Sequence, residues 1–177
     1  MQLERPRSSG TLAGKGAALA CTVLLAATLF GCDHATKAAA TTSLAGGGPV
    51  SLLGDLVVLR YVQNDDVAFS LMHNLGLGPS FASPLVLAAL AAGALVVLGV
   101  MWWRARRDAA SPRLVDVGFA AAFAGALGNL VDRLTHGYVV DFIHVKRWPV
   151  FNVADILVVV GMALVVLARR RRATIDG

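Results

Sequence analysis

Residues 151–167 read FNVADILVVVGMALVVL, and this stretch decides the fold class because a long apolar run follows a single carboxylate. Three more apolar runs occur earlier in the chain. Each approaches the roughly 20 residues that cross a bilayer, and continuous runs of this kind are typical of helices. We therefore predict a single integral-membrane domain over residues 1–177. Its transmembrane helices are expected at about 16–31, 84–103, 114–131 and 153–168.

The composition agrees with a membrane protein. Of the 177 residues, 56% are hydrophobic and only 15% are charged, which is far more apolar than a typical soluble domain. The net charge of +5 would suggest a nucleic-acid partner in a soluble chain. Here the basic residues cluster at the ends of the apolar runs, where they border the membrane. We therefore expect a membrane-lipid environment, no nucleic-acid partner and a monomer.

The basic residues also predict the orientation. They are concentrated in the N-terminal tail, in the loop after the second run and in the C-terminal tail: Arg5, Arg7, Lys15, Arg104, Arg106, Arg107, Arg113, Arg169, Arg170, Arg171 and Arg172. Four spans place these three regions on one side, which the positive-inside rule makes cytoplasmic. We expect a multi-pass membrane protein with both termini in the cytoplasm.

The first outer region, about residues 38–80, is expected to contain a small β element and an interfacial segment. Residues 50–53 and 56–62 are rich in β-branched and aliphatic side chains, and Gly54-Asp55 between them is typical of a turn. The apolar stretch 67–77 could form a short interfacial helix. The predicted fold class is therefore all-α membrane protein with a small β-sheet cradle on the outer membrane surface.

Two aspartates stand at this outer boundary, Asp141 and Asp155. A carboxylate at a membrane boundary costs free energy, so it is kept mainly where it works or is paired. Asn152 is a good N-cap, and Asp155 three residues later could simply complete a capping box. For Asp155 alone that interpretation is as good as catalysis, but it does not explain Asp141. Together the two suggest a dyad that shares a proton and activates water.

Other polar residues lie near the ends of the apolar runs. Asp33 and Lys37 are four residues apart, so they share a helix face and can pair. Gly125 and Gly128 would let a neighbouring helix approach closely. The remaining polar candidates at the outer side are Asn64, Asn129, Asp132 and Arg133. Each of these, taken alone, could be structural.

Several alternatives remain open from the residues alone. The acids could form the proton relay of a small membrane transporter, although they cluster at one boundary rather than at mid-membrane. A non-catalytic scaffold is a second alternative. His136 and His144 lie on the outer side, but no metal-binding spacing occurs, so we expect neither a metal nor another cofactor. The stretch before Cys32 imitates the signal of a lipoprotein, but Phe30 is bulky for such a cleavage site and three further apolar runs follow, so we expect the chain to stay uncut there.

Taken in order, these motifs resemble lipoprotein signal peptidase, or signal peptidase II. That family shows Asp-x-x-(Thr/Ser)-Lys, Asn-x-Gly-x-Ala-Phe, Gly-x-x-Gly-Asn-x-x-Asp-Arg, Val-x-Asp-Phe and Phe-Asn-x-Ala-Asp. The matching residues here are Asp33, Lys37, Asn64, Ala68, Phe69, Gly125, Gly128, Asn129, Asp132, Arg133, Val139, Asp141, Phe142, Phe151, Asn152, Ala154 and Asp155. Two departures are Asp66 in place of the family's Gly and a short stretch from 142 to 150.

The resemblance implies an aspartic endopeptidase of the bacterial inner membrane that removes the signal peptide from diacylglyceryl-modified prolipoproteins, before the lipidated Cys. It implies Asp141 and Asp155 as the catalytic pair. The residues expected to bind substrate or support the site are Asn64, Phe69, Asn129, Arg133, Asn152, Asp132, Asp33 and Lys37. Of these, Asp33, Lys37 and Asp132 are expected to be mostly structural.

Overall fold

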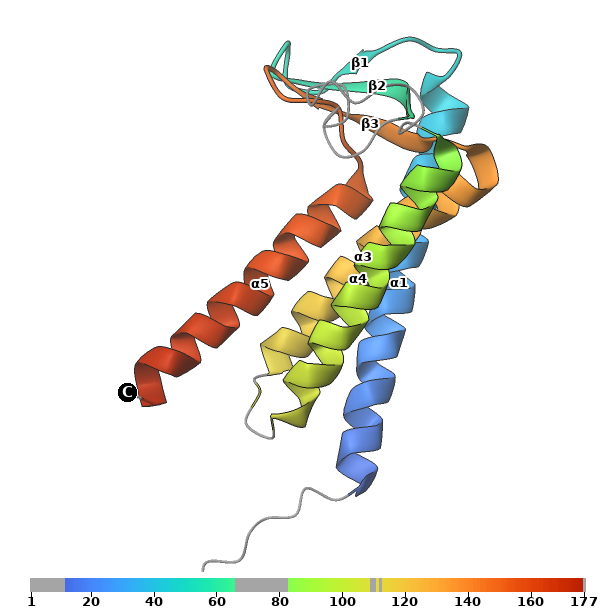
Figure 1. Cartoon of the computed structure of the whole chain (residues 1–177). Coiled ribbons are helices and arrows are strands. Elements are labelled where there is room, and N and C mark those ends of the chain that lie inside the picture. The colour runs from blue at the N-terminus through green and yellow to red at the C-terminus, as the bar shows by residue number, and fades with distance from the viewer. Residues whose placement is uncertain (1–11, 66–82, 109–110, 112, 177) are drawn as a thin grey trace, which may run out of the picture.

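Long helices make up most of the protein, as the computed structural model shows (Figure 1). The structure describes residues 12–65, 83–108, 111 and 113–176. The helices are α1 Leu12–Leu44, α3 Pro84–Arg107, α4 Arg113–His136 and α5 Val153–Asp176. All of them extend beyond the bounds expected from the apolar runs, because the polar ends of these runs remain helical.

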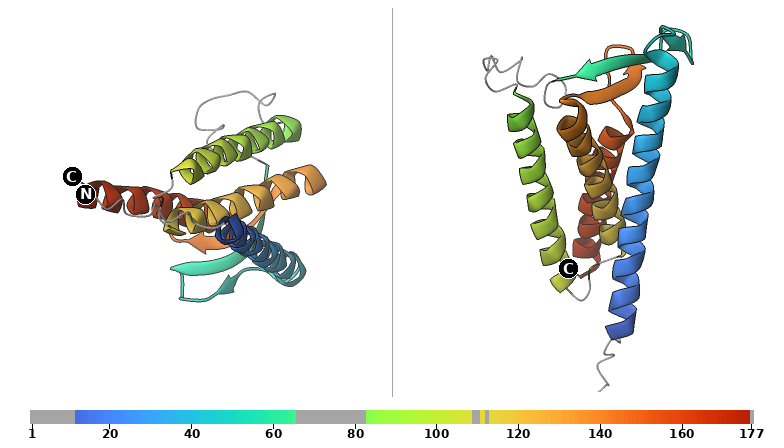
Figure 2. Two further views of the ribbon diagram at one scale, coloured as in Figure 1. Left: turned by 90° about the horizontal axis from the view of Figure 1, so that it is seen from below. Right: turned by 90° about the vertical axis from the view of Figure 1, so that its right-hand side faces the viewer.

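A small antiparallel sheet lies across one end of the helices (Figure 2). Its strands are β1 Val50–Ser51, β2 Val57–Asn64 and β3 Val139–Val145, in the order β1-β2-β3. Val50 pairs with Leu59 in the first ladder, and Asn64 pairs with Val139 in the second. We call this end of the molecule the sheet end. The opposite end, which carries Arg107, Arg113 and Arg169, we call the arginine end.

The structure corrects the expected outer region in two places. The first helix, which the pairing of Asp33 with Lys37 already extends beyond the span at 16–31, continues to Leu44, so residues 38–44 of the expected outer region are helical. The sheet also has a third strand, β3, which the sequence interpretation missed. The expected pair of strands is present, although β1 covers only Val50–Ser51. The expected interfacial helix at 67–77 lies outside the described residues.

The helices suit a membrane to different degrees. Within the described residues, three are long and apolar enough to span: Gly16–Leu44, Pro84–Arg107 and Arg113–His136. α5 has the same length as α4 but carries Asp155 in its first turn and a run of arginines near its end. The structure is therefore mostly helical, with apolar spanning helices and a three-stranded sheet.

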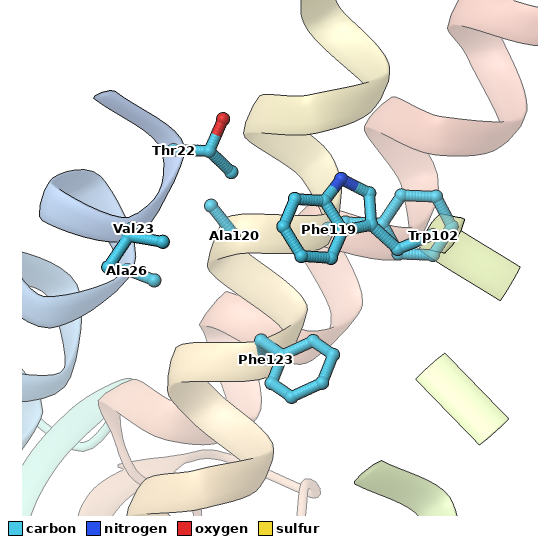
Figure 3. A pocket seen from close by; sticks show the side chains of 7 residues that line it. All are labelled: Thr22, Val23, Ala26, Trp102, Phe119, Ala120 and Phe123. Atoms are coloured by element: carbon cyan, nitrogen blue, oxygen red, sulfur yellow. The ribbon is translucent and has the colours of Figure 1, made fainter. Parts of the chain in front are cut away.

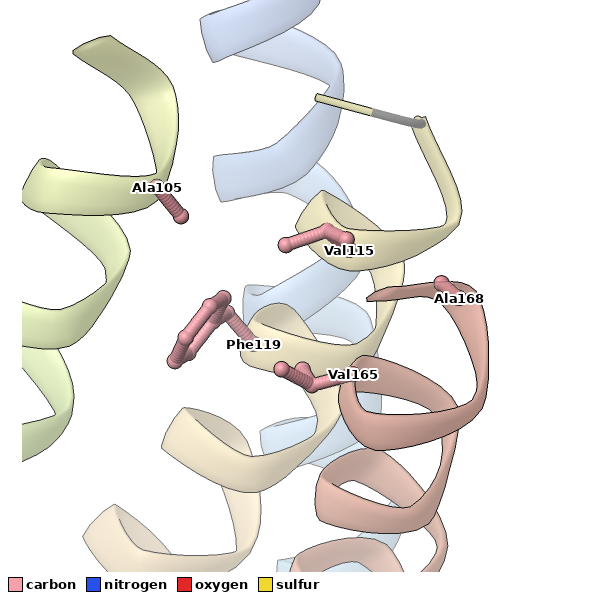
Figure 4. Packing of buried hydrophobic residues seen from close by; sticks show 5 residues of the cluster. All are labelled: Ala105, Val115, Phe119, Val165 and Ala168. Carbon is pink, nitrogen blue, oxygen red and sulfur yellow. The ribbon is translucent and has the colours of Figure 1, made fainter. Parts of the chain in front are cut away.

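The centre of the bundle is α4, which packs against α1, α3 and α5. Near the arginine end its residues Val115 and Phe119 are almost fully buried against Val165 and Ala168 of α5 and Ala105 of α3 (Figure 4). This apolar cluster fixes the three helices relative to each other. The polar residues of α4 that were singled out in the sequence lie at the other end, beneath the sheet.

Glycines bring α4 and α5 into backbone contact. A Cβ atom at Gly118 would lie 2.6 Å from the carbonyl oxygen of Gly161, and one at Gly125 would collide with the carbonyl oxygen of Ala154. Small residues at such crossings let helix backbones approach closely in membranes. The seam between α4 and α5 therefore has no room for side chains at these positions. This agrees with the interpretation of Gly125 as a packing residue.

We expect Gly118→Ala to lower the melting temperature of the detergent-solubilised protein by several degrees. The added methyl group must push the two backbones apart, and overpacking of this kind costs about 1–3 kcal/mol. The matched control is Gly93→Ala on α3, where a Cβ atom meets nothing within 4 Å. Because alanine favours helices, this control should be neutral or slightly stabilising. Equal melting temperatures for the two variants would contradict the close crossing.

Candidate active site

The two aspartates singled out in the sequence line one cavity at the sheet end. Asp141 lies on β3 and Asp155 lies in the first turn of α5. The cavity has a volume of about 310 Å³, and Asn64, Asn129 and Arg133 also line it. Its remaining wall is apolar and comes mainly from α3 and α5: Leu87, Leu90, Ala91, Ala94, Val158 and Val159. The site is thus a polar corner of a largely apolar cavity.

Asp155 is held by the start of its own helix. Asn152 is the N-cap residue, and its Oδ1 accepts a hydrogen bond from the Asp155 backbone N–H at 3.0 Å. In return, Asp155 Oδ2 accepts one from the Asn152 backbone N–H at 3.3 Å. This is a reciprocal capping box with Asp in place of Glu. The capping interpretation is therefore correct, and the same carboxylate also lines the cavity.

Asp141 is buried and held by two amides. Its Oδ2 accepts a hydrogen bond from Asn64 Nδ2 at 2.7 Å, and its Oδ1 accepts one from Asn152 Nδ2 at 2.7 Å. Burial raises the pKa of Asp141 to about 7. The two amide donors oppose this rise, whereas the nearby negative charge of Asp155 adds to it. Asp141 is therefore poised to hold a proton near neutral pH.

Asn129 links the two aspartates through the orientation of its amide. Its Nδ2 donates to Asp155 Oδ1 at 2.8 Å. Its Oδ1 accepts from Asn152 Nδ2 at 3.1 Å and from Lys37 Nζ at 2.9 Å. Because both contacts to Oδ1 are donors, the amide can point only its NH₂ group toward Asp155. Asn129 thus connects the Lys37 ammonium to the Asp155 carboxylate through one hydrogen bond on each side of its amide.

Lys37 is the centre of a buried ionic cluster beneath the cavity. Its ammonium lies 2.9 Å from Asp33 Oδ2 and 2.9 Å from Asp132 Oδ2, and all three residues are almost fully buried. Asp33 Oδ1 accepts a hydrogen bond from the Ala154 backbone N–H at 2.8 Å. Asp132 Oδ2 also accepts one from the Val140 backbone N–H at 3.2 Å. The cluster therefore connects α1 and α4 to the residues that precede each candidate aspartate.

The packing around this cluster leaves no room for a larger residue at Gly128. A Cβ atom there would collide with Asp33 Oδ2. The two glycines of the Gly-x-x-Gly-Asn motif thus leave space for two different neighbours. Gly125 admits the α5 backbone, and Gly128 admits the Asp33 carboxylate.

The other residues expected at the site have mixed outcomes. Arg133 lines the cavity, and its Nη1 donates to the Asn129 carbonyl oxygen at 3.2 Å. Phe69 and Asp66 lie outside the described residues. Among the described residues, no group of three or more His, Cys, Asp or Glu side chains could hold a metal ion. The sequence interpretation did not identify the apolar wall from α3, because aliphatic residues in a membrane helix carry no signal that separates a cavity from the lipid face.

The comparisons with known proteins agree with the motifs. Residues 25–170 match the family model described as signal peptidase (SPase) II. The lipoprotein signal peptidase of Rhodococcus jostii (strain RHA1) is 39% identical over 150 residues, which cover 81% of this chain and 69% of that protein. That of Mycobacterium avium (strain 104) is 40% identical, covering 81% and 75%. That of Pseudoalteromonas translucida (strain TAC 125) is 34% identical, covering 75% and 77%.

The fold also matches solved structures. One structure described as a bacterial membrane enzyme superposes with a TM-score of 0.69 at 24% identity, over 89% of this chain and 92% of the other. Another with the same description gives a TM-score of 0.66 at 25% identity, over 84% and 92%. Motif order, the family model and sequence identity to the relatives thus point to one family. The chain belongs to the signal peptidase II family of membrane proteases.

Proposed function

We propose that this protein cleaves diacylglyceryl-modified prolipoproteins immediately before the lipidated cysteine, with Asp141 and Asp155 as the catalytic pair. Membership of the signal peptidase II family supports the reaction. The single observation that supports the residues is that both carboxylates line one cavity, within range of each other's charge. Such a pair titrates as a unit, so that near neutral pH one proton is shared between two carboxyl groups.

In the proposed mechanism, Asp155 is the ionised member. It lies at the N-terminus of α5, where the helix dipole favours a negative charge. Its carboxylate takes a proton from a water molecule as the water oxygen attacks the scissile carbonyl carbon. Asp141, with its raised pKa, holds the proton that stabilises the developing oxyanion.

Breakdown of the tetrahedral intermediate completes the reaction. The C–N bond breaks, and the proton taken up by Asp155 passes to the leaving amine of the cysteine. The products are a signal peptide with a new carboxyl end and a lipoprotein with an N-terminal cysteine. Water and two carboxyl groups suffice for these steps, so no metal and no covalent intermediate are required.

The shape of the cavity suits a lipidated substrate. Its apolar wall, which includes Leu87 and Leu90 of α3 and Val159 of α5, would take the acyl chains. The polar corner would hold the peptide bond, with Asn64, Asn129, Arg133 and Asn152 orienting the aspartates or the substrate backbone. The sheet would hold the extended peptide above the membrane.

The test of this function is a cleavage assay with the purified full-length protein in detergent. The substrate is a diacylglyceryl-modified prolipoprotein, and its unmodified form is the control. We expect a product whose mass begins at the lipidated cysteine, no cleavage of the unmodified form, and the same rate in EDTA. Inhibition by EDTA that Zn²⁺ reverses would contradict the carboxylate mechanism.

We also propose four spans, with α5 as the fourth and the sheet end facing outward. α5 is as long as α4, and its C-terminal end, which carries Arg169–Arg171, lies at the same end of the molecule as the end of α3 and the start of α4 (Figure 1). Such basic clusters favour the cytoplasmic side. A phosphatase reporter fused after Arg172 should therefore be inactive, and one inserted at Gly54 should be active in the periplasm. An active reporter at Arg172 would contradict four spans.

A further inference from the structure

A groove runs between α1 and α4 at the arginine end, away from the aspartates. It consists of two cavities. The first, of about 460 Å³, lies between the start of α1, including Gly14, Ala18 and Thr22, and the start of α4 at Arg113. The second, of about 150 Å³, lies deeper and is almost wholly apolar (Figure 3). Thr22 lines both cavities, so they are neighbours along one seam.

The groove has the depth of one membrane leaflet. On α4 its lining begins at Arg113 and reaches Phe123, which are 10 positions apart. At 1.5 Å per residue this is roughly 15 Å, about half of a bilayer's hydrocarbon core of ~30 Å. Val23, Ala26 and Ala120 line its deep part. The lining of the groove thus changes from polar at the arginine end to apolar at mid-membrane. A phospholipid has the same arrangement, with a polar headgroup and apolar acyl chains.

The mouth of the groove offers one cation to a ligand. Arg113 is exposed, and within the described part of the chain its guanidinium forms no hydrogen bond or ion pair. Asp116 also lines the mouth, and its carboxylate accepts a hydrogen bond from Trp102 Nε1 at 2.7 Å. The carboxylate therefore has a partner in the protein, whereas the Arg113 guanidinium is left to attract an anionic group.

We infer that this groove binds one anionic phospholipid from the leaflet on the arginine side. The phosphodiester lies at Arg113, because guanidinium groups bind phosphate with charge-assisted hydrogen bonds. One acyl chain passes Thr22 and fills the apolar cavity beside Trp102 and Phe123. The lipid would supply packing contacts that the cavity walls otherwise lack, and so hold α1 against α4. This site is separate from the aspartate cavity, which lies at the other end of α4.

Native mass spectrometry of the full-length protein tests this inference. The protein in mild detergent is titrated with phosphatidylglycerol or with phosphatidylcholine of the same acyl chains. We expect one phosphatidylglycerol to be retained with about tenfold higher affinity than phosphatidylcholine. Arg113→Gln should remove that preference. The matched control is Arg60→Gln on β2, which removes an exposed arginine at the opposite end.

A second pair of variants tests the acyl-chain position. Ala26→Phe fills the deep cavity and should weaken retention of both lipids about tenfold. Ala27→Phe is the control, since Ala27 lies exposed on the same helix and does not line the cavity. Unchanged cleavage activity in all variants would show that they fold. Equal retention of the two lipids by the wild type, or equal behaviour of the Arg113 and Arg60 variants, would overturn the inference. A dimer that Ala26→Phe disrupts would also overturn it, because a second chain would then fill the groove.

Discussion

Asp141→Asn and Asp155→Asn should each abolish detectable cleavage while the protein still accumulates in the membrane. Each substitution removes either the proton donor or the base from the proposed dyad. General acid–base catalysis contributes about 10²–10⁴-fold, so the rate constant should fall at least that far. The measurement is cleavage of a diacylglyceryl-modified prolipoprotein by equal amounts of purified protein.

Asn keeps the size of the side chain and one accepting oxygen at both positions, while its NH₂ group replaces an oxygen that accepts a second hydrogen bond. We therefore expect some loss of stability in both variants but normal accumulation. At position 141 the amide oxygen can still accept the hydrogen bond that Asn64 or Asn152 donates. At position 155 it can still accept the capping bond from the Asn152 backbone. Loss of activity at normal protein abundance would therefore indicate a catalytic role for Asp141 and Asp155 rather than a structural one.

Asp132→Asn is the matched control for the dyad variants. Asp132 is as buried as Asp141, but it contacts Lys37 and the Val140 backbone rather than the cavity. We expect this variant to accumulate less but to keep most of its activity per molecule. If Asp132→Asn were inactive at normal abundance while Asp141→Asn remained active, the catalytic pair would be assigned to the wrong residues.

Lys37→Met should have the largest effect on stability. It removes the cation that pairs with both Asp33 and Asp132 and that donates to the Asn129 side chain, and it leaves two carboxylates buried together. Breaking a buried ion pair from one side costs about 3–5 kcal/mol. We expect little of this variant to accumulate in the membrane. Its melting temperature in detergent should fall further below that of the wild type than the melting temperature of Gly118→Ala does.

A double variant tests whether Lys37→Met destabilises the protein by leaving two carboxylates without a cation or simply by removing the lysine side chain. Asp33→Asn combined with Lys37→Met leaves only one carboxylate in the cluster, and the Asn oxygen can still accept the bond from Ala154. The double variant should therefore be more stable than Lys37→Met alone. If it were less stable, the ion pairs would not explain the burial of these residues.

Local features of the site were predictable from the sequence. The spacing of Asp33 and Lys37 predicts a shared helix face, and the structure shows their ion pair at 2.9 Å. The Asn152-x-x-Asp155 pattern predicts a capping box, and both of its hydrogen bonds are present. These predictions succeed because each depends on contacts within one helical turn.

Contacts between distant segments were not predictable. Lys37 reaches Asn129 across 92 positions in the chain, and no local pattern specifies that contact. Asn64 reaches Asp141 because β2 pairs with β3, a strand that the sequence interpretation missed. Residues 138–145, YVVDFIHV, are rich in β-branched and aromatic residues, which was the available signal.

The first helix continues further than the predicted span. Gly31 and the polar residues after it mark the expected end of the span, and the pairing of Asp33 with Lys37 predicts that the helix goes on past it, because a span and a helix need not end together. Residues 32–44 include four alanines and no Gly or Pro, so α1 continues to Leu44. The extension brings Asp33 and Lys37 to the cluster on one rigid element.

The central claim is that Asp141 and Asp155 share one proton during cleavage, and the pH dependence of kcat/KM tests it most directly. The mechanism needs Asp141 protonated, and its pKa is raised to about 7. Activity should therefore fall about tenfold per pH unit as the pH rises above that value. In Asn64→Ala, a hydrogen bond that lowers this pKa is lost, so the fall should begin at higher pH. A rate that stays constant up to pH 9 in the wild type, or a shift to lower pH in Asn64→Ala, would contradict the account.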